Sequence, residues 1–451
     1  MCAESHSLPE GVTDRLMARV LAPIPAPAGD PPSVSDALGR AQERLTVRDW
    51  HVIPPDRGTS EQWRAAIHVT WPEERAADAD VAASSAHPDA AGASRAYGVW
   101  LQKRLSLDEW HFEGQGFAEG EREALCRAVW AVGVETQLQD PPLTDYHRLL
   151  RTLAALAPSA LAALDISSCT LRSGRWLREA AACPVPPHPR NLFGIHSVSL
   201  DASGQGHRWL HTHGLLRCGA IEFELLDVPP ASLGVALELM EAICVGAIER
   251  GSGRPRTPFS PGADIVLEWL TWPDAARRFR RLLGAREQDR DDYHRLPSGV
   301  LVERAGVWPL RRYQPPRRAY DILRRRPVLY VSDAETRRME RLARLRFEVF
   351  RQAFRRCRGV KGWNFFIKLG YPIPSARASG ADREHLWFEC SDLREDCALV
   401  RLLNQPRYVE GMRQGDCAWR ELGPLTDWHI QGPEGRYDPD SAPSAGDDNL
   451  D

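Results

Sequence analysis

A stretch rich in proline and arginine, residues 282–330, is the feature that most limits how this chain can fold. It contains the run WPLRRYQPPRRAYDILRRRP and has the composition of a connector. The chain has 451 residues, of which 43% are apolar, so the parts on either side can each bury a core. We therefore expect an α+β protein of two domains.

Low-complexity segments mark the edges of the folded parts. Residues 1–40 are rich in Pro, Ala and Ser and are predicted to be disordered, as is the acidic tail 437–451. Residues 76–93 are predicted to form a surface loop. The first domain should then span residues 45–281 and the second residues 332–432.

The first domain shows the periodicities of both strands and helices. Strands are predicted at 65–71, 97–101, 163–171 and 265–272, and helices at 117–132, 145–156 and 230–250. Residues 192–200 and 208–213 flank the turn sequence ASGQG, which predicts a hairpin.

Four sequence blocks of this domain resemble a known family. They are LDEWHF (107–112), SGRWLREAA (173–181), LFGIHSVSL (192–200) and WLHTHGLLRCGAIEFELLDV (209–228). Over about residues 95–275 the chain resembles domain of unknown function 4026. The resemblance places a domain and implies no activity.

The second domain is expected to open with a helix over residues 333–357. Ser332 and Glu335 have the spacing of a capping box, and an apolar stripe along the helix should pack on a sheet. The blocks FFIKLGYPIP, EHLWFEC, LLNQPRYVEGMRQGDCAW and LTDW then follow. They resemble the YegJ-like domain of unknown function 2314, over about residues 332–430. We expect a helix packed on a small, strongly bent antiparallel sheet of about five strands.

Period-two alternation separates the two faces of this second sheet. The residues expected to face the core are Phe365, Ile367, Leu369, Leu386, Phe388 and Cys390. The opposite face then carries Phe366, Lys368, His385, Trp387 and Glu389. An exposed tryptophan among a cation, an imidazole and a carboxylate is the composition of a protein-binding patch.

Three further residues complete this candidate surface. Asn404 lies in a turn, and Asp427 and Trp428 end a strand. In the competing interpretation, the helix covers this face and Trp387 belongs to the core, while Asp427 caps a backbone N–H and Trp428 packs on the sheet. The residues alone favour the competing interpretation.

A second candidate site is based on histidine. His211 and His213 lie two apart on a predicted strand, so their side chains share a face. A hairpin turn centred near Gly204 would place His196 opposite His211. Three converging imidazoles suit Zn²⁺ with an open fourth position for water.

A hydrolytic zinc site also needs a nearby carboxylate. Glu222 or Glu224 is the candidate base or supporting partner. Alternatively, His211 and His213 hydrogen-bond the backbone where Gly214 bends the chain. The residues alone favour this structural role, since the spacing of the pair is common in proteins.

An excess of arginine over residues 277–361 is compatible with nucleic-acid binding. Stacking aromatics do not accompany it along a predicted sheet, which weighs against that partner. The sequence contains no Gly-x-Ser-x-Gly elbow, Walker phosphate loop or dinucleotide fingerprint. The chain is therefore expected to act by binding more than by catalysis.

Cysteine usage and charge favour a cytoplasmic protein. The ten cysteines show no CxxC spacing, the N-terminus lacks the pattern of a signal peptide, and the net charge is −3. No stretch is expected to reach the roughly 18 apolar residues of a membrane span. The first hypothesis is an accessory or immunity-like module that binds another protein, with no cofactor. The alternatives are a zinc-dependent hydrolase and a nucleic-acid-associated protein.

Overall fold

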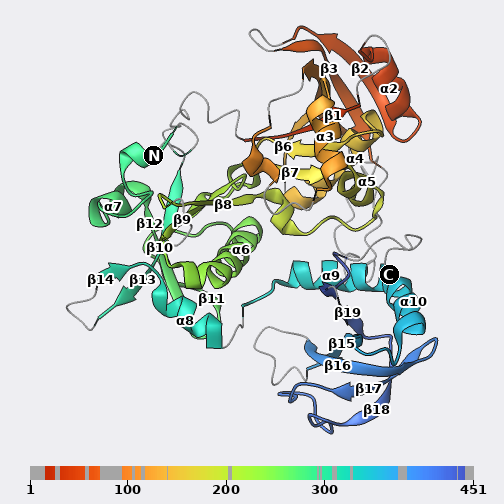
Figure 1. Ribbon diagram of the computed structural model, residues 1–451, viewed down its shortest axis with the longest axis vertical. Helices are drawn as coiled ribbons and strands as arrows, with labels where there is room; N and C mark the ends of the chain where they lie inside the picture. Colours follow the sequence, from red (N-terminus) through yellow and green to blue (C-terminus); the bar gives the residue numbers. More distant parts are fainter. Residues whose placement is uncertain are drawn as a thin grey trace, which may run out of the picture. The chain divides into compact units, whose positions relative to one another are not determined.

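The computed structural model describes residues 16–25, 31–55, 60–71, 94–103, 107–112, 117–139, 141–201, 206–291, 294, 297–306, 312–325, 329–373, 383–433 and 435–441. These residues form two compact units (Figure 1). Unit 1 holds the described residues up to Pro184 together with Pro189–Tyr330. Unit 2 holds Val185–His188 and the described residues from Val331 onward. Both units combine helices with largely antiparallel sheets, which confirms the α+β fold class.

The first half of unit 1 is built on a seven-stranded antiparallel sheet. In spatial order its strands are β2 (Thr46–Ile53), β3 (Glu61–Thr70), β4 (Ser94–Lys103), β5 (Trp130–Gln137), β1 (Met17–Ile24), β6 (Ala162–Asp165) and β7 (Thr170–Ser173). Its helices are α2 (Val34–Gln42), α3 (Glu119–Arg127), α4 (Pro142–Leu156) and α5 (Gly174–Ala182). Leu149, Leu153 and Leu156 follow one face of α4 and are fully buried, which packs α4 onto β5 and β1.

The N-terminal segment expected to be disordered contains an interior strand. β1 pairs with β5 along its whole length and with β6 on its other side. The prediction is therefore wrong for Met17–Ile24, and also for α2. An average over Pro, Ala and Ser conceals a strand whose hydrogen bonds come from partners more than 100 residues away. Residues 1–15 lie outside the described residues.

Several other elements of this half differ from the sequence prediction. The helix expected over 117–132 ends at Arg127, and the chain continues as β5. The strand expected over 163–171 is a hairpin of β6 and β7. The strands expected at 65–71 and 97–101 are confirmed as parts of β3 and β4. The loop expected over 76–93 lies outside the described residues.

The second half of unit 1 is a mixed sheet with helices on both faces. In spatial order its strands are β11 (Phe259–Gly262), β12 (Ile265–Thr271), β13 (Ser298–Ala305), β10 (Glu222–Val228), β9 (Arg208–His213) and β8 (Gly194–Val198), and β14 (Arg312–Gln314) pairs with β13. Only β10 and β13, among these described pairs, run parallel. Helices α6 (Leu233–Arg250) and α8 (Arg317–Arg325) pack on one face, and α7 (Trp272–Arg278) with residues 279–285 packs on the other.

The segment 282–330 is not a simple connector. It supplies β13, which lies between β10 and β12 with Val300, Leu301 and Val302 buried. It also supplies β14 and α8. Prolines and arginines are concentrated in residues 309–318 and dominate the average composition of the whole stretch. The average therefore does not reveal the short strand sequence SGVLVERA.

Helix α6 is long and apolar, and the helix expected at 230–250 is confirmed. Within the described part of the chain, Pro230–Arg250 meets the length and composition of a membrane span, which the sequence analysis did not expect; 44% of that window is buried inside the protein. Its buried side chains include Leu239, Met240 and Ile243 and pack against the sheet. This packing is that of a core helix on a sheet face.

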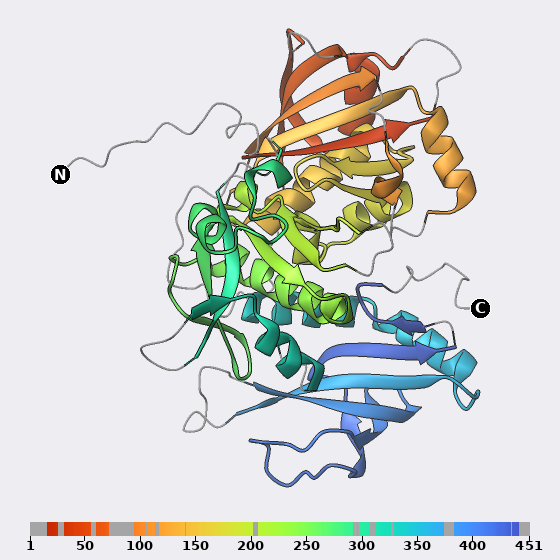
Figure 2. The same cartoon turned by 60° about the vertical axis from the view of Figure 1, so that its left-hand side comes forward.

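Unit 2 is a six-stranded antiparallel sheet with two helices. The strand order is β18 (Cys417–Glu421), β17 (Cys397–Leu402), β16 (Arg383–Leu393), β15 (Asn364–Pro372), β19 (Leu425–Gly432) and β20 (Gly435–Tyr437). Helices α9 (Asp333–Leu345) and α10 (Phe347–Cys357) run along one face of it (Figures 1 and 2). Phe350 and Phe354 of α10 contact Phe365 of β15, so this face is the core.

Three predictions for unit 2 have mixed outcomes. The N-cap is confirmed, because the Ser332 hydroxyl accepts a hydrogen bond from the Glu335 backbone N–H at 3.0 Å. The single helix expected over 333–357 breaks at Arg346, and the turn there lets α10 face the sheet independently of α9. The tail expected to be disordered from residue 437 is ordered as far as residue 441, where Asp440 accepts from the Arg338 guanidinium at 3.0 Å. The remaining tail residues lie outside the described part.

Candidate functional site

The predicted hairpin forms and brings three histidines onto one face of the second sheet of unit 1. β8 and β9 pair with His196 opposite His211, which is the register that the turn sequence predicted. His213 lies on the same face of β9. The ring centroids of the three histidines are separated by 5.0, 5.1 and 5.7 Å.

A fourth histidine, His294, completes the cluster from 83 positions further along the chain than His211. Its Nε2 lies 3.0 Å from Nε2 of His211, and its ring centroid lies 5.4 Å from that of His213. One nitrogen each from His211, His213 and His294 fall within 4.8 Å of one another. Sequence reasoning missed His294, because only the short Asp291-x-x-His294 spacing marks it and that spacing is unspecific.

The surroundings orient His294 and keep His211 in a form that can bind a metal. Asp291 Oδ1 lies 2.7 Å from His294 Nδ1, and this contact turns the Nε2 side of the ring towards His211. His211 Nδ1 is buried without a hydrogen-bond partner among the described residues. Burial, with added repulsion from His213 and His294, lowers the pKa of His211 far below its ordinary value. Neutral imidazole is the state that metals bind.

His196 is held in a different role. Its Nε2 lies 3.2 Å from the backbone oxygen of Ser168, and burial lowers its pKa. One of its two ring nitrogens is thus engaged with a carbonyl. The nitrogens that lie close enough together to share a metal ion belong to His211, His213 and His294, which differs from the predicted set of His196, His211 and His213.

The two candidate glutamates hold the structure around the cluster. Glu222 accepts from the backbone N–H of Gly214 at 3.0 Å and fixes the turn after β9, and burial raises its pKa. Glu224 accepts from Trp209 Nε1 at 2.9 Å and forms an ion pair with Arg290. Both carboxylates already accept from strong donors, which fits the predicted alternative of a supporting partner better than that of a base.

The donor set fits a zinc ion. Nitrogen ligands about 2 Å from a tetrahedral zinc stand about 3.4 Å apart. The 3.0 Å separation of the His211 and His294 nitrogens is close to this spacing. Bringing His213 to the same spacing needs only a closure of roughly 1 Å, since it lies within 4.8 Å of the others. Neutral nitrogen donors also suit this metal.

In unit 2, the candidate binding surface lies on the face of the sheet opposite α9 and α10. Trp387 is partly exposed there, so among the described residues of this unit the helix does not cover it. Lys368 Nζ lies 5.3 Å from the centre of the Trp387 ring. His429 contacts the same ring edge-on at 4.9 Å and stacks on Phe366 at 4.4 Å. We call Phe366, Lys368, Trp387 and His429 the aromatic patch.

Other residues assigned to this surface have local partners. His385 Nδ1 lies 3.0 Å from the Thr426 hydroxyl, and Glu389 pairs with Arg401. Asn404 accepts a hydrogen bond from the Trp387 backbone N–H at 2.8 Å and so positions that strand.

Trp428 does not belong to the surface. It is fully buried on the core face and donates from Nε1 to the Ala343 carbonyl at 3.0 Å. Asp427 accepts from the Trp428 backbone N–H at 2.8 Å, which is the capping role considered above. The predicted separation of the two faces agrees with the structure along β15 and β16, and Trp428 packs on the sheet as in the competing interpretation, not on the candidate surface.

Arginines of the segment 277–361 are dispersed over several elements. Arg286 pairs with Asp289, Arg304 with Glu268, Arg338 with Glu335 and Arg344 with Glu340. Much of this charge is thus balanced locally. Arginines paired in this way do not form a continuous basic stripe.

Family comparisons agree with the resemblance in unit 1. Residues 89–187 match the N-terminal part of the protein family of unknown function DUF4026, and residues 195–302 match its C-terminal part. The DUF4026 prediction is confirmed, and the C-terminal match contains all four clustered histidines. No curated protein and no solved structure matches the chain. The YegJ-like assignment of unit 2 stays a prediction.

Proposed function

We propose that the DUF4026 region of this chain binds Zn²⁺ through His211, His213 and His294. The observation that supports this most strongly is the convergence of three imidazole nitrogens within 4.8 Å at a largely buried place. Nε2 of His211 and Nε2 of His294 face each other at 3.0 Å, and one metal ion could be bound by both nitrogens.

The chemistry of the proposed centre follows from its ligand count. Three histidines leave a fourth position, and zinc in such a site activates water for hydrolysis. Asp291 would orient His294 through its contact with Nδ1, and Glu224 would hold Arg290 and Trp209 in place around the cluster. With both glutamates occupied, metal binding is the primary proposal, and hydrolysis is the activity to screen for once metal is found.

The test is the metal content of purified, tag-free protein by elemental mass spectrometry. We expect about one zinc per chain, lost in His211→Ala and in His294→Ala. His196→Ala should retain zinc, because its ring is engaged with Ser168. His207→Ala is the matched control, since His207 pairs with Asp227 away from the cluster.

Two outcomes would contradict the proposal. One is parent protein that stays metal-free after refolding with added zinc. The other is zinc that persists in both His211→Ala and His294→Ala. Loss of zinc in His196→Ala and in His211→Ala, with zinc retained in His294→Ala, would return the site to the set that the sequence predicted.

A second candidate function is protein binding through the aromatic patch of unit 2, as in an accessory or immunity-like module. It is favoured by a partly exposed tryptophan held between a lysine and a histidine on a sheet face that its own helices do not cover. Trp387→Ala and Lys368→Ala should each abolish partner capture from the native cell extract while circular dichroism stays unchanged. Val360→Ala, at another exposed apolar position, is the control. Retained capture by both patch variants would eliminate this surface.

A further inference from the structure

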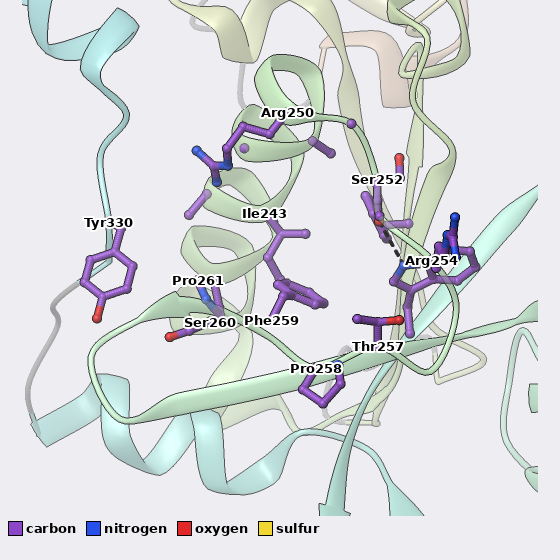
Figure 3. A pocket seen from close by; sticks show the side chains of 17 residues that line it. Ile243, Arg250, Ser252, Arg254, Thr257, Pro258, Phe259, Ser260, Pro261 and Tyr330 are labelled. Carbon is purple, nitrogen blue, oxygen red and sulfur yellow. Dashed lines mark hydrogen bonds between the residues drawn. The ribbon is translucent and has the colours of Figure 1, made fainter. Parts of the chain in front are cut away.

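A pocket of about 240 Å³ lies on the other face of the same sheet, away from the histidines. Its walls are the C-terminal half of α6, the loop that follows it, and β11 (Figure 3). Figure 3 shows Ile243 and Phe259 in the middle of the pocket, with Arg250 on one side and Arg254 on the other. No residue of the proposed metal site lines it.

The pocket is held open by bonds between the loop and the sheet. Trp269 Nε1 donates to the Ser252 carbonyl at 2.9 Å, and the Ser252 hydroxyl accepts from the Ile221 backbone N–H at 2.9 Å. Gly251 and Gly253 have φ of 79° and 66°, which lets the loop turn sharply at the end of α6. These contacts shape the pocket before any ligand arrives, which limits the entropy lost on binding.

The floor of the pocket is apolar and partly aromatic. Phe223, Ile243 and Trp269 come from β10, α6 and β12, and Phe259 adds a ring from β11. Gly246 removes a side chain from the wall of α6. A Cβ at this position would lie 2.6 Å from an Arg250 guanidinium nitrogen, so the Arg250 side chain folds back over Gly246 along the pocket wall.

Two guanidinium groups at the rim lack strong internal partners. The Arg254 guanidinium forms no ion pair or hydrogen bond among the described residues. The carboxylate recorded for Arg250 is Glu249, at 3.8 Å, with the Arg250 side chain 70% exposed. The carbonyl end of α6 carries partial negative charge, so any anion held here depends on these two arginines.

We propose that this pocket binds a small amphipathic anion, a single aromatic ring or short acyl chain that carries a carboxylate or phosphate. The ring or chain would lie against the apolar floor, and the anionic group would pair with one of the two rim arginines, Arg250 or Arg254. The volume is below the usual ligand range of about 300–1,000 Å³, so one ring is the largest body that fits. This proposal does not depend on the zinc site.

The test uses the full chain with benzoate, hexanoate, phenyl phosphate and, as the uncharged probe, benzyl alcohol. Binding is measured by saturation-transfer NMR and by calorimetric titration. We expect at least one anion to bind with a dissociation constant below about 10 mM, and benzyl alcohol to bind at least roughly tenfold more weakly. The carboxylate and phosphate probes distinguish the two possible anionic groups.

Matched variants locate the binding. Arg250→Gln or Arg254→Gln, whichever removes the arginine that pairs with the anion, should weaken anion binding roughly tenfold, and unchanged binding in both variants would overturn the proposal. Arg325→Gln, at an exposed arginine of α8 outside the pocket, should leave anion binding unchanged. Gly246→Leu should abolish binding of all probes by filling the cavity, while leucine is well tolerated in a helix.

The proposal is overturned if no anion saturates the parent protein. It is equally overturned if Gly246→Leu binds like the parent, since the ligand would then lie elsewhere. Equal affinity for benzyl alcohol and benzoate would show that the arginines do not contribute to binding, which would also overturn the proposal.

Discussion

Asp427 and His429 of strand β19 are two partly buried titratable residues whose pKa values shift in opposite directions. Burial raises the pKa of Asp427 to about 6, although Lys368 opposes the shift, and burial lowers the pKa of His429 to about 4. Between about pH 4 and pH 6, folded Asp427 keeps a proton that the unfolded chain releases, so its contribution to stability falls as pH rises. Below about pH 6.5, unfolded His429 binds a proton that the folded form excludes, so its contribution rises with pH.

Removing either group should therefore reveal how the other group makes the stability of the protein depend on pH. As the pH rises from about 4 to about 6.5, the free energy of unfolding of Asp427→Asn should increase relative to the parent protein, and that of His429→Gln should decrease. Each change should be on the order of 2 kcal/mol. The measurement is hydrogen–deuterium exchange of peptides from β15 and β19 near pH 4 and near pH 6.5. If the stability of both variants changed with pH in the same way, burial would not control these pKa values.

At the scale of elements, close approach between neighbouring strands explains a glycine inside β5. Gly133 lies directly opposite Trp100 of β4, and a Cβ at Gly133 would sit 2.2 Å from the indole. Trp100 is only 4% exposed, and its Nε1 donates to Gln102 at 2.6 Å, so the ring has no room to move away. A glycine at this place permits the indole to lie flat over the neighbouring strand.

Gly133→Ala should therefore destabilise the protein by about 1–3 kcal/mol through overpacking. Gly39→Ala in helix α2 is the control. A Cβ there meets nothing within 4 Å, so the change should be neutral or stabilising by up to about 1 kcal/mol. Urea unfolding of the full chain compares the two. An unaffected Gly133→Ala would mean that the indole can be displaced without cost.

Elements with strong local periodicity were predictable, and those without it were not. The hairpin of β8 and β9 was predicted with its register, because a turn sequence and two alternating strands lie within about 20 residues. The break at Arg346 was missed, because the apolar stripe continues through it and only packing on the sheet decides the turn. Strand β13 was missed, because its hydrogen-bond partners β10 and β12 are far from it in sequence.

At the scale of the whole molecule, one predicted domain boundary agrees with the structure and the other does not. Unit 2 begins at Val331, next to the predicted start at residue 332, whereas unit 1 continues to Tyr330, well beyond the predicted end at residue 281. The stretch between these two positions supplies an interior strand of unit 1. Unit 2 also takes in Val185–His188, where the Pro186 carbonyl accepts from Arg338 at 3.2 Å. A four-residue piece so far from the rest of its unit carries no compositional signal.

Residue spacing along short stretches of chain was enough to predict the α+β class, the faces of β15 and β16, and the pairing of His196 with His211. Tertiary structure decided which histidines converge. His294 joins His211 and His213 across 83 positions, while a carbonyl at Ser168 engages His196. It also decided that Glu222 and Glu224 act as structural acceptors, and that a pocket forms where α6, its following loop and β11 meet. Such groupings depend on contacts between distant segments, which no local pattern encodes.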